Sequence, residues 1–365
     1  MCEEDGYLNE AELLEDPETE EDASSSWHPG KPLSYSTGTF KNGAIGLSNI
    51  GVKSCLNSLL QTFYMNEDFA DILCRIGEAT DNVPLERSFP YELLALFEEM
   101  QDSEEDAVSP YRILSCLRTH KVRLFSPYDV AELFSTLVNL LLEQMPHPYL
   151  EEKLRNLYTI RLEESMTCLK CSNQRSSDTN LLTIHLQVYH SRYHRTMTLE
   201  RGLRRFFKTK KASGGESWCI CPKCGEDSKS VKDERLRSLP RTLTVDLKRI
   251  RQRKSSQLQK INRTLTFPPT LDLSEVLDPE HLPEQEYAQS QYIYNIFAVV
   301  AHSGTPNSGH FCTYIKSSKD QKWYCFNDSS VCRVSWDDVK CAYGNTIFHW
   351  GVTACLLIYI QSDGK

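Results

Sequence analysis

The chain has 365 residues, of which 40% are hydrophobic and 25% are charged. This composition is typical of a soluble globular protein and excludes collagen, long coiled coils and wholesale disorder. No window approaches the roughly 18 consecutive apolar residues of a membrane-spanning helix, so we expect no membrane insertion. The acidic start, MCEEDGYLNE, has the features of neither a secretory signal nor a mitochondrial transit peptide.

The net charge of -9 is unevenly distributed along the chain. Residues 1–25 contain eleven Asp or Glu and no Lys or Arg, and the rest of the chain has 39 acidic and 41 basic residues. We therefore predict an acidic disordered tail over residues 1–38 and one folded domain over residues 39–362. A nearly neutral domain argues against a nucleic-acid-binding protein.

The first part of the domain has the pattern of packed helices. The sequence LNSLLQTFYM places Leu56, Leu59, Leu60 and Phe63 on one face of an amphipathic helix. Helical patterns continue in PYELLALFEEM, PYRILSCLRTH and DVAELFSTLVNLLLEQM. These segments predict a helical part over about residues 45–145.

The second part has the pattern of strands. After about residue 157, apolar and polar residues alternate in LYTIRLEESMTC and NLLTIHLQVY, as in half-buried strands, and similar segments continue to TACLLIYI. We interpret the basic run from Lys248 to Lys254 as a solvated loop between strands, because no aromatic residues interleave it. The predicted fold class is therefore α+β, with a mainly antiparallel β region.

Fourteen cysteines are many for a chain whose thiols we expect to stay reduced. Cys168 and Cys171 form one CxxC pair, and Cys221 and Cys224 form a second pair within CPKCG. Two such pairs, each flanked by strand-like sequence, predict a tetrahedral four-thiolate zinc site. Four protein ligands leave no position for water, so the zinc would be structural, and we expect no catalytic cofactor. The alternative is two unrelated pairs of surface thiols.

Three separated segments together suggest thiol hydrolase chemistry: GLSNIGVKSCLNS, SGHF and WYCFND. Such chemistry needs a nucleophile at a helix N-terminus, where the helix dipole favours the thiolate. It needs a His that takes the proton and returns it to the leaving amine, and an Asn or Asp that orients this His. It also needs amide donors for the oxyanion, which Asn49 could supply. Each piece alone is weak evidence, because a lone His is usually structural and Asn-Asp is usually a turn.

Together these segments resemble the ubiquitin-specific protease family. GLSNIGVKSCLNS resembles the family's Cys box, FSPYDVAELF the box that follows it, and SGHFCTYI with WYCFNDSSV its His box. LPRTLTVDLKRI and TFPPTLDL resemble further segments, and the two CxxC pairs match the family's fingers. The resemblance covers about residues 40–360 in order and is strongest to an interferon-induced member.

The resemblance implies a papain-like cysteine protease fold. In this fold a helical thumb would cover about residues 45–145, zinc-ribbon fingers about 157–235 and an antiparallel β palm about 236–362. It also implies cleavage of the isopeptide bond between a ubiquitin-like modifier and a lysine of a target protein. For the interferon-induced member, the implied modifier is the interferon-stimulated one with two tandem ubiquitin-like folds. That member is also expected to dampen type I interferon signalling by binding the receptor chain, and to reside in the cytoplasm or also in the nucleus.

The resemblance also assigns roles to individual residues. His310 is the expected general base and acid, Asn327 orients it, Asp328 is a candidate second orienter, and Asn49 is the oxyanion donor. Asp129 is the candidate for an acidic wall along the channel that receives the modifier's arginine-containing tail. A helix-capping role for Asp129 is an equally open alternative.

The nucleophile position departs from the family pattern. The family places a Cys five residues after the Asn of the Cys box, and that position here is Ser54, followed by Cys55. Adjacent side chains on a helix diverge by about 100°, so Cys55 is an alternative nucleophile only if the register is shifted. A hydroxyl is a much weaker acid than a thiol, so Ser54 predicts little activity with retained binding, whether this serine is natural or was introduced.

Two functions therefore remain open at the level of the sequence. One is a modifier-specific isopeptidase that is weakened or inactivated at Ser54. The other is a binding and regulatory protein that uses the same fold to hold a modifier or a receptor chain. The absence of a thiol at position 54 is the feature on which the choice depends.

Overall fold

The computed structural model describes residues 44–51, 54–76, 88–124, 130–188, 197–207, 217–225, 227–252, 257–283, 288–344 and 351–363. The predicted acidic tail and Asp129 lie outside these residues. Among the described residues, no helix has both the length and the apolar character needed to cross a membrane.

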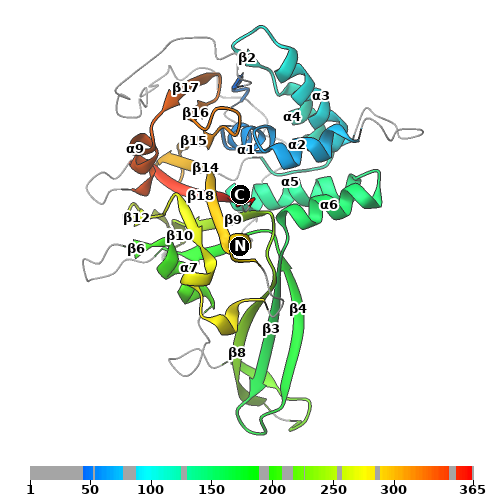
Figure 1. Cartoon of the computed structure of the whole chain (residues 1–365), viewed down its shortest axis with the longest axis vertical. Coiled ribbons are helices and arrows are strands. Elements are labelled where there is room, and N and C mark those ends of the chain that lie inside the picture. Colours follow the sequence, from blue (N-terminus) through cyan, green and yellow to red (C-terminus); the bar gives the residue numbers. More distant parts are fainter. Residues whose placement is uncertain are drawn as a thin grey trace, which may run out of the picture. The chain divides into compact units, whose positions relative to one another are not determined.

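The first part of the described chain is helical, as predicted (Figure 1). Its helices are α1 (Ser54–Tyr64), α2 (Glu67–Cys74), α3 (Phe89–Asp102), α4 (Tyr111–Thr119), α5 (Val130–Gln144) and α6 (Pro148–Tyr158). A short parallel pair, β1 (Gly46–Leu47) with β2 (Ala107–Val108), accompanies them. Because α6 continues the helical part to Tyr158, this part extends beyond the predicted end near residue 145.

Local sequence explains where the helices begin. The Asn66 side chain caps α2 by accepting a hydrogen bond from the backbone N–H of Phe69 at 3.3 Å, and two acidic residues occupy the first turn. Helix α1 has the predicted apolar face, but its polar face is buried as well. Its buried polar residues are Ser54, Asn57, Ser58, Gln61 and Thr62. This helix therefore lies inside the protein, and its polar side chains need partners there.

A large mixed sheet forms the second part. Its strands are β17 (Ser330–Val334), β16 (Trp323–Asn327), β15 (Gly309–Lys316), β14 (Ile293–Gly304), β18 (Thr353–Gln361), β9 (Thr242–Lys248) and β5 (Ile184–Gln187), in that order. Strand β13 (Thr270–Asp272) also pairs with β14. All these neighbours are antiparallel except β5 and β9, which are parallel. The prediction of a mainly antiparallel β region is therefore correct for this sheet, with one parallel edge.

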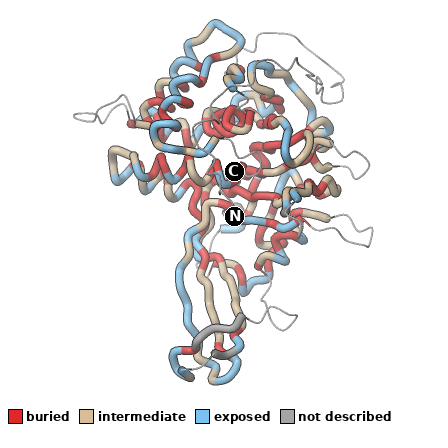
Figure 2. The backbone as a smooth tube through the Cα atoms, turned by 180° about the vertical axis from the view of Figure 1, so that it is seen from behind, coloured by how far each residue is buried: buried red, intermediate tan, exposed pale blue. Residues whose placement is uncertain are grey.

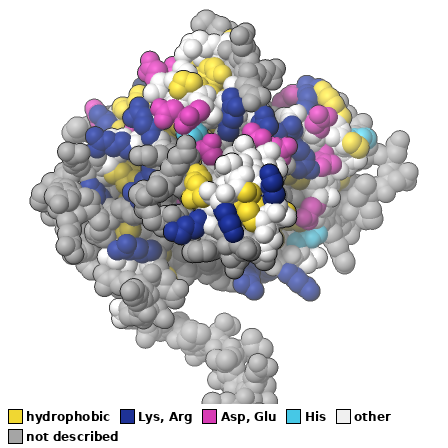
Figure 3. Space-filling view, turned by 90° about the horizontal axis from the view of Figure 1, so that it is seen from below, with side chains coloured by type: hydrophobic (Ala, Val, Ile, Leu, Met, Phe, Trp, Pro, Cys, Tyr) yellow, Lys and Arg dark blue, Asp and Glu magenta, His cyan; other side chains and the backbone are white. Residues whose placement is uncertain are grey.

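A second sheet has the order β4-β3-β8-β7. It consists of β3 (Ile160–Cys168), β4 (Gln174–Leu181), β7 (Ser217–Ile220) and β8 (Asp227–Ser238). Strand β4 is mostly exposed, and the long strands of this sheet show few buried residues in Figure 2. The Lys232 ammonium lies 2.7 Å from the Glu164 carboxylate and 2.9 Å from that of Glu234. Basic and acidic side chains are likewise interspersed on the face of the protein shown in Figure 3.

The remaining elements are short. They are β6 (Met197–Thr198), α7 (Leu199–Phe207), β10 (Ile250–Gln252), β11 (Leu258–Lys260), β12 (Leu265–Thr266), α8 (Leu273–Val276), α9 (Trp336–Val339) and three 3-10 helices, Pro279–His281, Gln289–Tyr292 and Lys340–Tyr343. Helix α7 was not predicted, because it lies within a region whose overall pattern is that of strands. The interpretation of Lys248–Lys254 as a solvated loop is wrong in part, since β10 occupies its centre and Arg249 is fully buried.

The main hydrophobic core lies between the helices and one face of the large sheet. It joins side chains of α1 to α6 with residues from β14, β15, β16 and β18. At its centre Phe63 stacks on Phe69 and Phe134, with ring centroids 4.8 and 5.8 Å apart, and Tyr158 meets Phe134 edge-on. Burying an aromatic side chain of this size contributes about 1.5–3 kcal/mol, so this cluster fixes α1 against α2, α5 and α6.

Candidate active site and cysteine cluster

Ser54 is the first residue of α1 and is almost completely buried. Its Oγ accepts a hydrogen bond from the backbone N–H of Phe311 at 3.1 Å. Phe311 follows His310 on β15, so this contact brings the start of α1 to the strand that carries the predicted base. A side chain at a helix N-terminus also lies in the positive field of the helix dipole.

His310 is paired with Asn327 across neighbouring strands. The His310 Nε2 lies 2.5 Å from the Asn327 Oδ1, and the two residues lie on β15 and β16. Because a carbonyl oxygen only accepts, Nε2 is the donor in this contact. Asn327 thus orients the ring, and in a neutral imidazole with this tautomer Nδ1 is the nitrogen that can act as a general base.

Asp328 connects several parts of the site. Its carboxylate accepts hydrogen bonds from the side-chain Nδ2 of Asn49 and of Asn57, each at 2.8 Å, and lies 3.7 Å from the His310 Nε2. Burial raises the pKa of the Asp328 carboxyl, and the contacts with Asn57, His310 and Asn49 act in the opposite direction. Asn49, Asn57 and His310 thus surround Asp328, Asn327 contacts His310, and Ser54 contacts the residue after His310.

Asn57 was not predicted as part of this site. It lies three residues after Ser54, one helical turn along α1, and its side chain points to the same region. Its spacing from Ser54 was visible in the sequence, but its partner Asp328 is 271 residues away. Only the tertiary structure could show that these two residues meet.

Cys55 occupies a different environment from Ser54. It is half-buried and packs against the main hydrophobic core, whereas the Ser54 Oγ contacts β15. This difference agrees with the angular separation expected for neighbouring positions on a helix. The arrangement supports the register in which position 54, not position 55, is the nucleophile position.

A cleft is lined in part by Phe311, the residue after His310. Its lining includes Val130, Asp246, Arg249, Arg251, Phe311 and Cys355. Val130 directly follows Asp129, the predicted channel residue, which lies outside the described residues. The Asp246 carboxylate already has two partners, because it lies 2.8 Å from the His185 Nδ1 and 2.9 Å from the Lys248 Nζ. The described lining thus contains both acidic and basic groups.

Two buried cations stabilise the backbone behind this cleft. The Arg249 guanidinium donates to four carbonyl oxygens at 2.7 to 3.0 Å, and the Lys260 ammonium donates to three at 3.0 to 3.1 Å. Burial lowers the pKa of Arg249 to about 10 and that of Lys260 to about 8. Each of these two side chains therefore holds several backbone segments together by hydrogen bonds.

His302 lies behind the predicted base, on β14. Strands β14 and β15 pair His302 with Phe311 and Ser303 with His310. A side chain at Gly309 would place its Cβ 2.0 Å from the His302 Nε2, so only glycine fits there. Burial, followed by the charges of Lys260 and His310, lowers the pKa of His302 to about 3. His302 is thus a neutral packing residue that fixes the start of β15.

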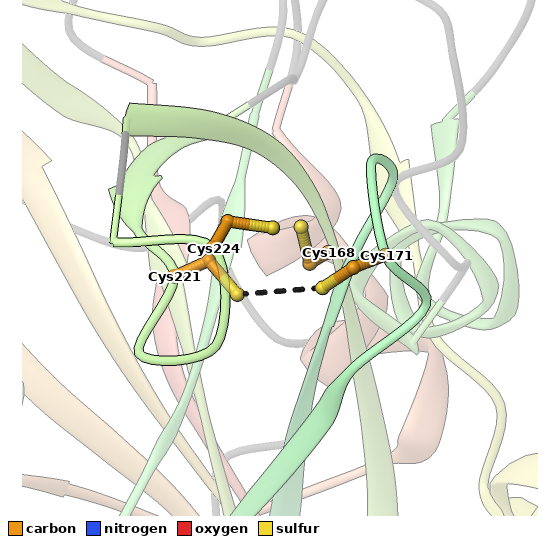
Figure 4. A group of neighbouring side chains, drawn as sticks. All are labelled: Cys168, Cys171, Cys221 and Cys224. Carbon is orange, nitrogen blue, oxygen red and sulfur yellow. Dashed lines mark hydrogen bonds between the residues drawn. The ribbon is translucent and has the colours of Figure 1, made fainter.

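The four predicted zinc ligands lie together at the ends of two hairpins (Figure 4). Cys168 ends β3, and Cys171 lies in the turn that leads to β4, while Cys221 and Cys224 lie between β7 and β8. Their four sulfur atoms all lie within 4.8 Å of one another, and the Cys171 and Cys221 sulfurs are 3.6 Å apart. The two pairs are therefore one cluster and not separate surface thiols.

The two turns have the same backbone geometry. The N–H of Ser172 donates to the Cys168 carbonyl at 2.9 Å, and the N–H of Gly225 donates to the Cys221 carbonyl at 2.8 Å. Ser172 and Gly225 both have positive φ angles, 57° and 68°. A hydrogen bond from the backbone N–H of Cys224 is the largest factor that lowers the pKa of Cys221. Each turn thus brings its two sulfurs to the same cluster.

This donor set fits a zinc ion. A tetrahedral site with Zn–S bonds of about 2.3 Å places its sulfurs about 3.8 Å apart, which is close to the spacing of this cluster. Cys168 and Cys221 are buried, and the other two cysteines are half-buried. Zinc bound by all four thiolates would join the two hairpins, and it would have no open position for a substrate.

A helix start against the strand that carries an imidazole, an amide that holds this imidazole and a mixed α+β fold are consistent with a papain-like hydrolase, in which a thiol would stand at the position of Ser54. Residues 45–359 match the family model described as ubiquitin carboxyl-terminal hydrolase. The chain therefore belongs to this family, whose members are cysteine-type hydrolases.

Similar proteins support the assignment. The chain is 41% identical over 324 residues to Ubl carboxyl-terminal hydrolase 18 of Homo sapiens, which covers 89% of this chain and 87% of that protein. It is 41% identical over 321 residues to the protein of the same name from Mus musculus, covering 88% and 86%. It is 23% identical over 395 residues to ubiquitin carboxyl-terminal hydrolase 47 of Drosophila melanogaster, covering 88% of this chain but 25% of that protein. The family resemblance seen in the sequence is thereby confirmed.

Proposed function

We propose that this chain binds a ubiquitin-like modifier and has an isopeptidase site whose activity is severely reduced by Ser54. The observation that carries this proposal is the position of the Ser54 Oγ, at the start of α1 and against the residue after His310. His310 in turn is held by Asn327. Ser54, His310 and Asn327 come from distant segments, and these two contacts support the arrangement of nucleophile, base and orienting amide that acyl transfer requires.

The reaction with a thiol at position 54 would proceed in two steps. The thiol proton moves to the His310 Nδ1 as the sulfur attacks the carbonyl carbon of the modifier's C-terminal residue. The C–N bond of the isopeptide then breaks, and His310 returns the proton to the departing lysine amine. Water hydrolyses the resulting thioester with the same base, and Asn49 would stabilise the oxyanion in both steps.

A serine weakens the first step without changing the shape of the site. A thiol has a reference pKa of about 8.5 and is partly ionised near neutral pH, whereas a hydroxyl must lose its proton during the attack itself. The volume of the side chain changes little, so binding should survive. A chain that holds a modifier without releasing it efficiently would act as a binding and regulatory protein, which is the second function we retain.

We further propose the interferon-stimulated modifier with two tandem ubiquitin-like folds as the partner. Support comes from the similarity to the Ubl carboxyl-terminal hydrolase 18 proteins, whose name specifies a ubiquitin-like substrate. Damping of type I interferon signalling through the receptor chain, and a cytoplasmic or also nuclear location, are parts of the same proposal. The cleft beside Phe311 would receive the modifier's C-terminal tail.

The division into thumb, fingers and palm is also part of the proposal. The four-stranded sheet with its cysteine cluster would form zinc-ribbon fingers, and the helices and the large sheet would form the thumb and palm. The common backbone geometry of the two CxxC turns supports this assignment.

The proposal is tested with the chain as it stands. Binding of the tandem modifier and of ubiquitin is measured by calorimetry, and cleavage is followed with fluorogenic C-terminal amides of both. We expect binding of the tandem modifier with cleavage barely above background. Fast cleavage that disappears in the Cys55→Ala variant would show that Cys55 is the nucleophile, and absence of binding to either modifier would refute the proposal.

A further inference from the structure

The turn between β16 and β17 is held closely against the segment that precedes α1. The backbone N–H of Leu47 donates to the Asp328 carbonyl at 2.9 Å. A Cβ on Gly46 would lie 2.5 Å from the Ser329 carbonyl oxygen, so the two backbones touch. This turn carries Asp328 directly after Asn327, and the segment after Leu47 carries Asn49.

The Asp328 side chain reinforces this contact from two directions. Its Oδ2 accepts from Asn49 and its Oδ1 accepts from Asn57, each at 2.8 Å. Asp328 also has a φ angle of 51°, a conformation that is unfavourable for residues other than glycine. Such a conformation persists only where the surroundings hold it in place, and the two amide donors are such a restraint.

The orientation of the Asn57 amide is determined by its neighbours. Its Nδ2 faces three oxygen atoms, which are the carbonyls of Leu47 and Ser48 and the Asp328 Oδ1. The opposite orientation would place an oxygen against these acceptors. Its own Oδ1 is buried without a hydrogen-bond partner, which reduces stability. The hydrogen bond from the Asn57 Nδ2 to Asp328 is thus kept although the Asn57 Oδ1 is buried without a partner.

We propose that Asn57 is a positioning residue that, through Asp328, sets the place of Asn49 relative to His310. This inference rests on the proposed function, because Asn49 is the oxyanion donor only if the site hydrolyses isopeptides. Asn57 contacts neither the modifier nor the reacting atoms. It acts by joining α1, the segment before α1 and the turn that follows Asn327.

Gln61 provides a matched control on the same helix. It is buried one turn further along α1, its Nε2 donates to the Ile45 carbonyl at 2.7 Å, and its Oε1 likewise lacks a partner. Replacing Gln61 by Leu removes a buried amide of the same kind. That change leaves the hydrogen bonds of Asp328 with Asn49 and Asn57 intact.

The test uses the Ser54→Cys protein as the active parent and compares Asn57→Leu with Gln61→Leu. We expect Asn57→Leu to lower kcat by roughly 10- to 100-fold with KM changed less than about threefold, since misplaced catalytic groups lower the rate more than binding. Gln61→Leu should leave kcat within about threefold of the parent. Thermal unfolding and modifier binding confirm that each variant is folded.

A double-mutant cycle then identifies the route through Asp328. If Asn57 acts through Asp328, the Asn57→Leu change should have little further effect on kcat in an Asp328→Asn protein. The positioning role alone would be overturned if Asn57→Leu and Gln61→Leu lowered kcat equally. It would also be overturned if the effects of Asn57→Leu and Asp328→Asn on kcat were fully additive. An inactive Ser54→Cys parent would overturn the proposed function and this inference together.

Discussion

The cysteine cluster and the cleft beside Phe311 are both assembled from distant segments, but they differ in construction. The cluster consists of two nearly identical turns, each specified by a few consecutive residues, which meet at the ends of hairpins. The predicted catalytic residues near this cleft are single side chains from α1, β15, β16 and the β16–β17 turn, joined by hydrogen bonds between these elements. Local motifs therefore specify the first site, whereas packing of the whole domain specifies the second.

The largest expected effect is the loss of zinc from the cysteine cluster, which should leave the predicted catalytic residues in place. We expect one equivalent of zinc per chain by atomic emission, and none in a Cys221→Ser variant. Because roughly 10 kcal/mol or more of binding free energy is coupled to folding at such sites, the four-stranded sheet should become sensitive to proteolysis.

The control for the zinc prediction is Cys74→Ser, which replaces an exposed cysteine on α2 and should retain the metal. In a Ser54→Cys background, the Cys221→Ser variant should still hydrolyse a short peptide amide while it loses affinity for the modifier. A metal-free wild-type chain with an intact sheet would contradict the zinc assignment.

The next effect concerns the cleft alone. Ser54→Cys should raise cleavage of a fluorogenic modifier amide by roughly a thousandfold or more, because a thiolate replaces a hydroxyl beside an already oriented His310. Cys55→Ala in the same background should keep this gain. If Ser54→Cys did not raise the cleavage rate, groups other than the residue at position 54 would also have to differ from those of an active site.

A smaller effect tests the support of the cleft. Arg249→Met leaves four carbonyl oxygens without their charged donor, so it should lower the free energy of unfolding by roughly 3–5 kcal/mol. Arg251→Met, two positions away on an exposed side chain, should change it by less than about 0.5 kcal/mol. Urea denaturation measures both values, and equal losses would show that burial of Arg249 is unimportant.

The smallest effect is a dependence on pH. The pKa of His302 is about 3 in the folded protein and about 6.5 when unfolded, so the unfolded state binds the proton first. The stability due to neutral His302 is complete above about pH 6.5 and is lost as the pH falls toward 3, with about 2 kcal/mol lost between pH 7 and 5. A His302→Asn variant should lack this part of the pH dependence, whereas His147→Gln should retain it.

The sequence predicted different amounts of the two sites for physical reasons. Cys168, Cys171, Cys221 and Cys224 could be identified completely, because the spacing of each pair determines a local turn. Ser54, His310, Asn327, Asp328 and Asn49 could be found by resemblance to a family. Asn57 could not, because its role depends on a contact across most of the chain.

The fold shows the same limit. Hydrophobic periodicity identified α1 and its apolar face, but it could not show that the polar face is buried too, since this depends on what packs there. The basic run around Arg249 has the composition of a surface loop. Its burial depends on four carbonyl groups from three other segments, which no local pattern contains.

The most direct test of the central claim is to map the covalent adduct of a modifier that carries an electrophile at its C-terminus. Because the Ser54 Oγ contacts the residue after His310 and Cys55 packs against the hydrophobic core, the unaltered chain should form no adduct at Cys55 while it binds the probe. The Ser54→Cys protein should form one adduct, located at position 54 by peptide mass spectrometry. An adduct on Cys55 of the unaltered chain would contradict the register and the proposed impairment of the site.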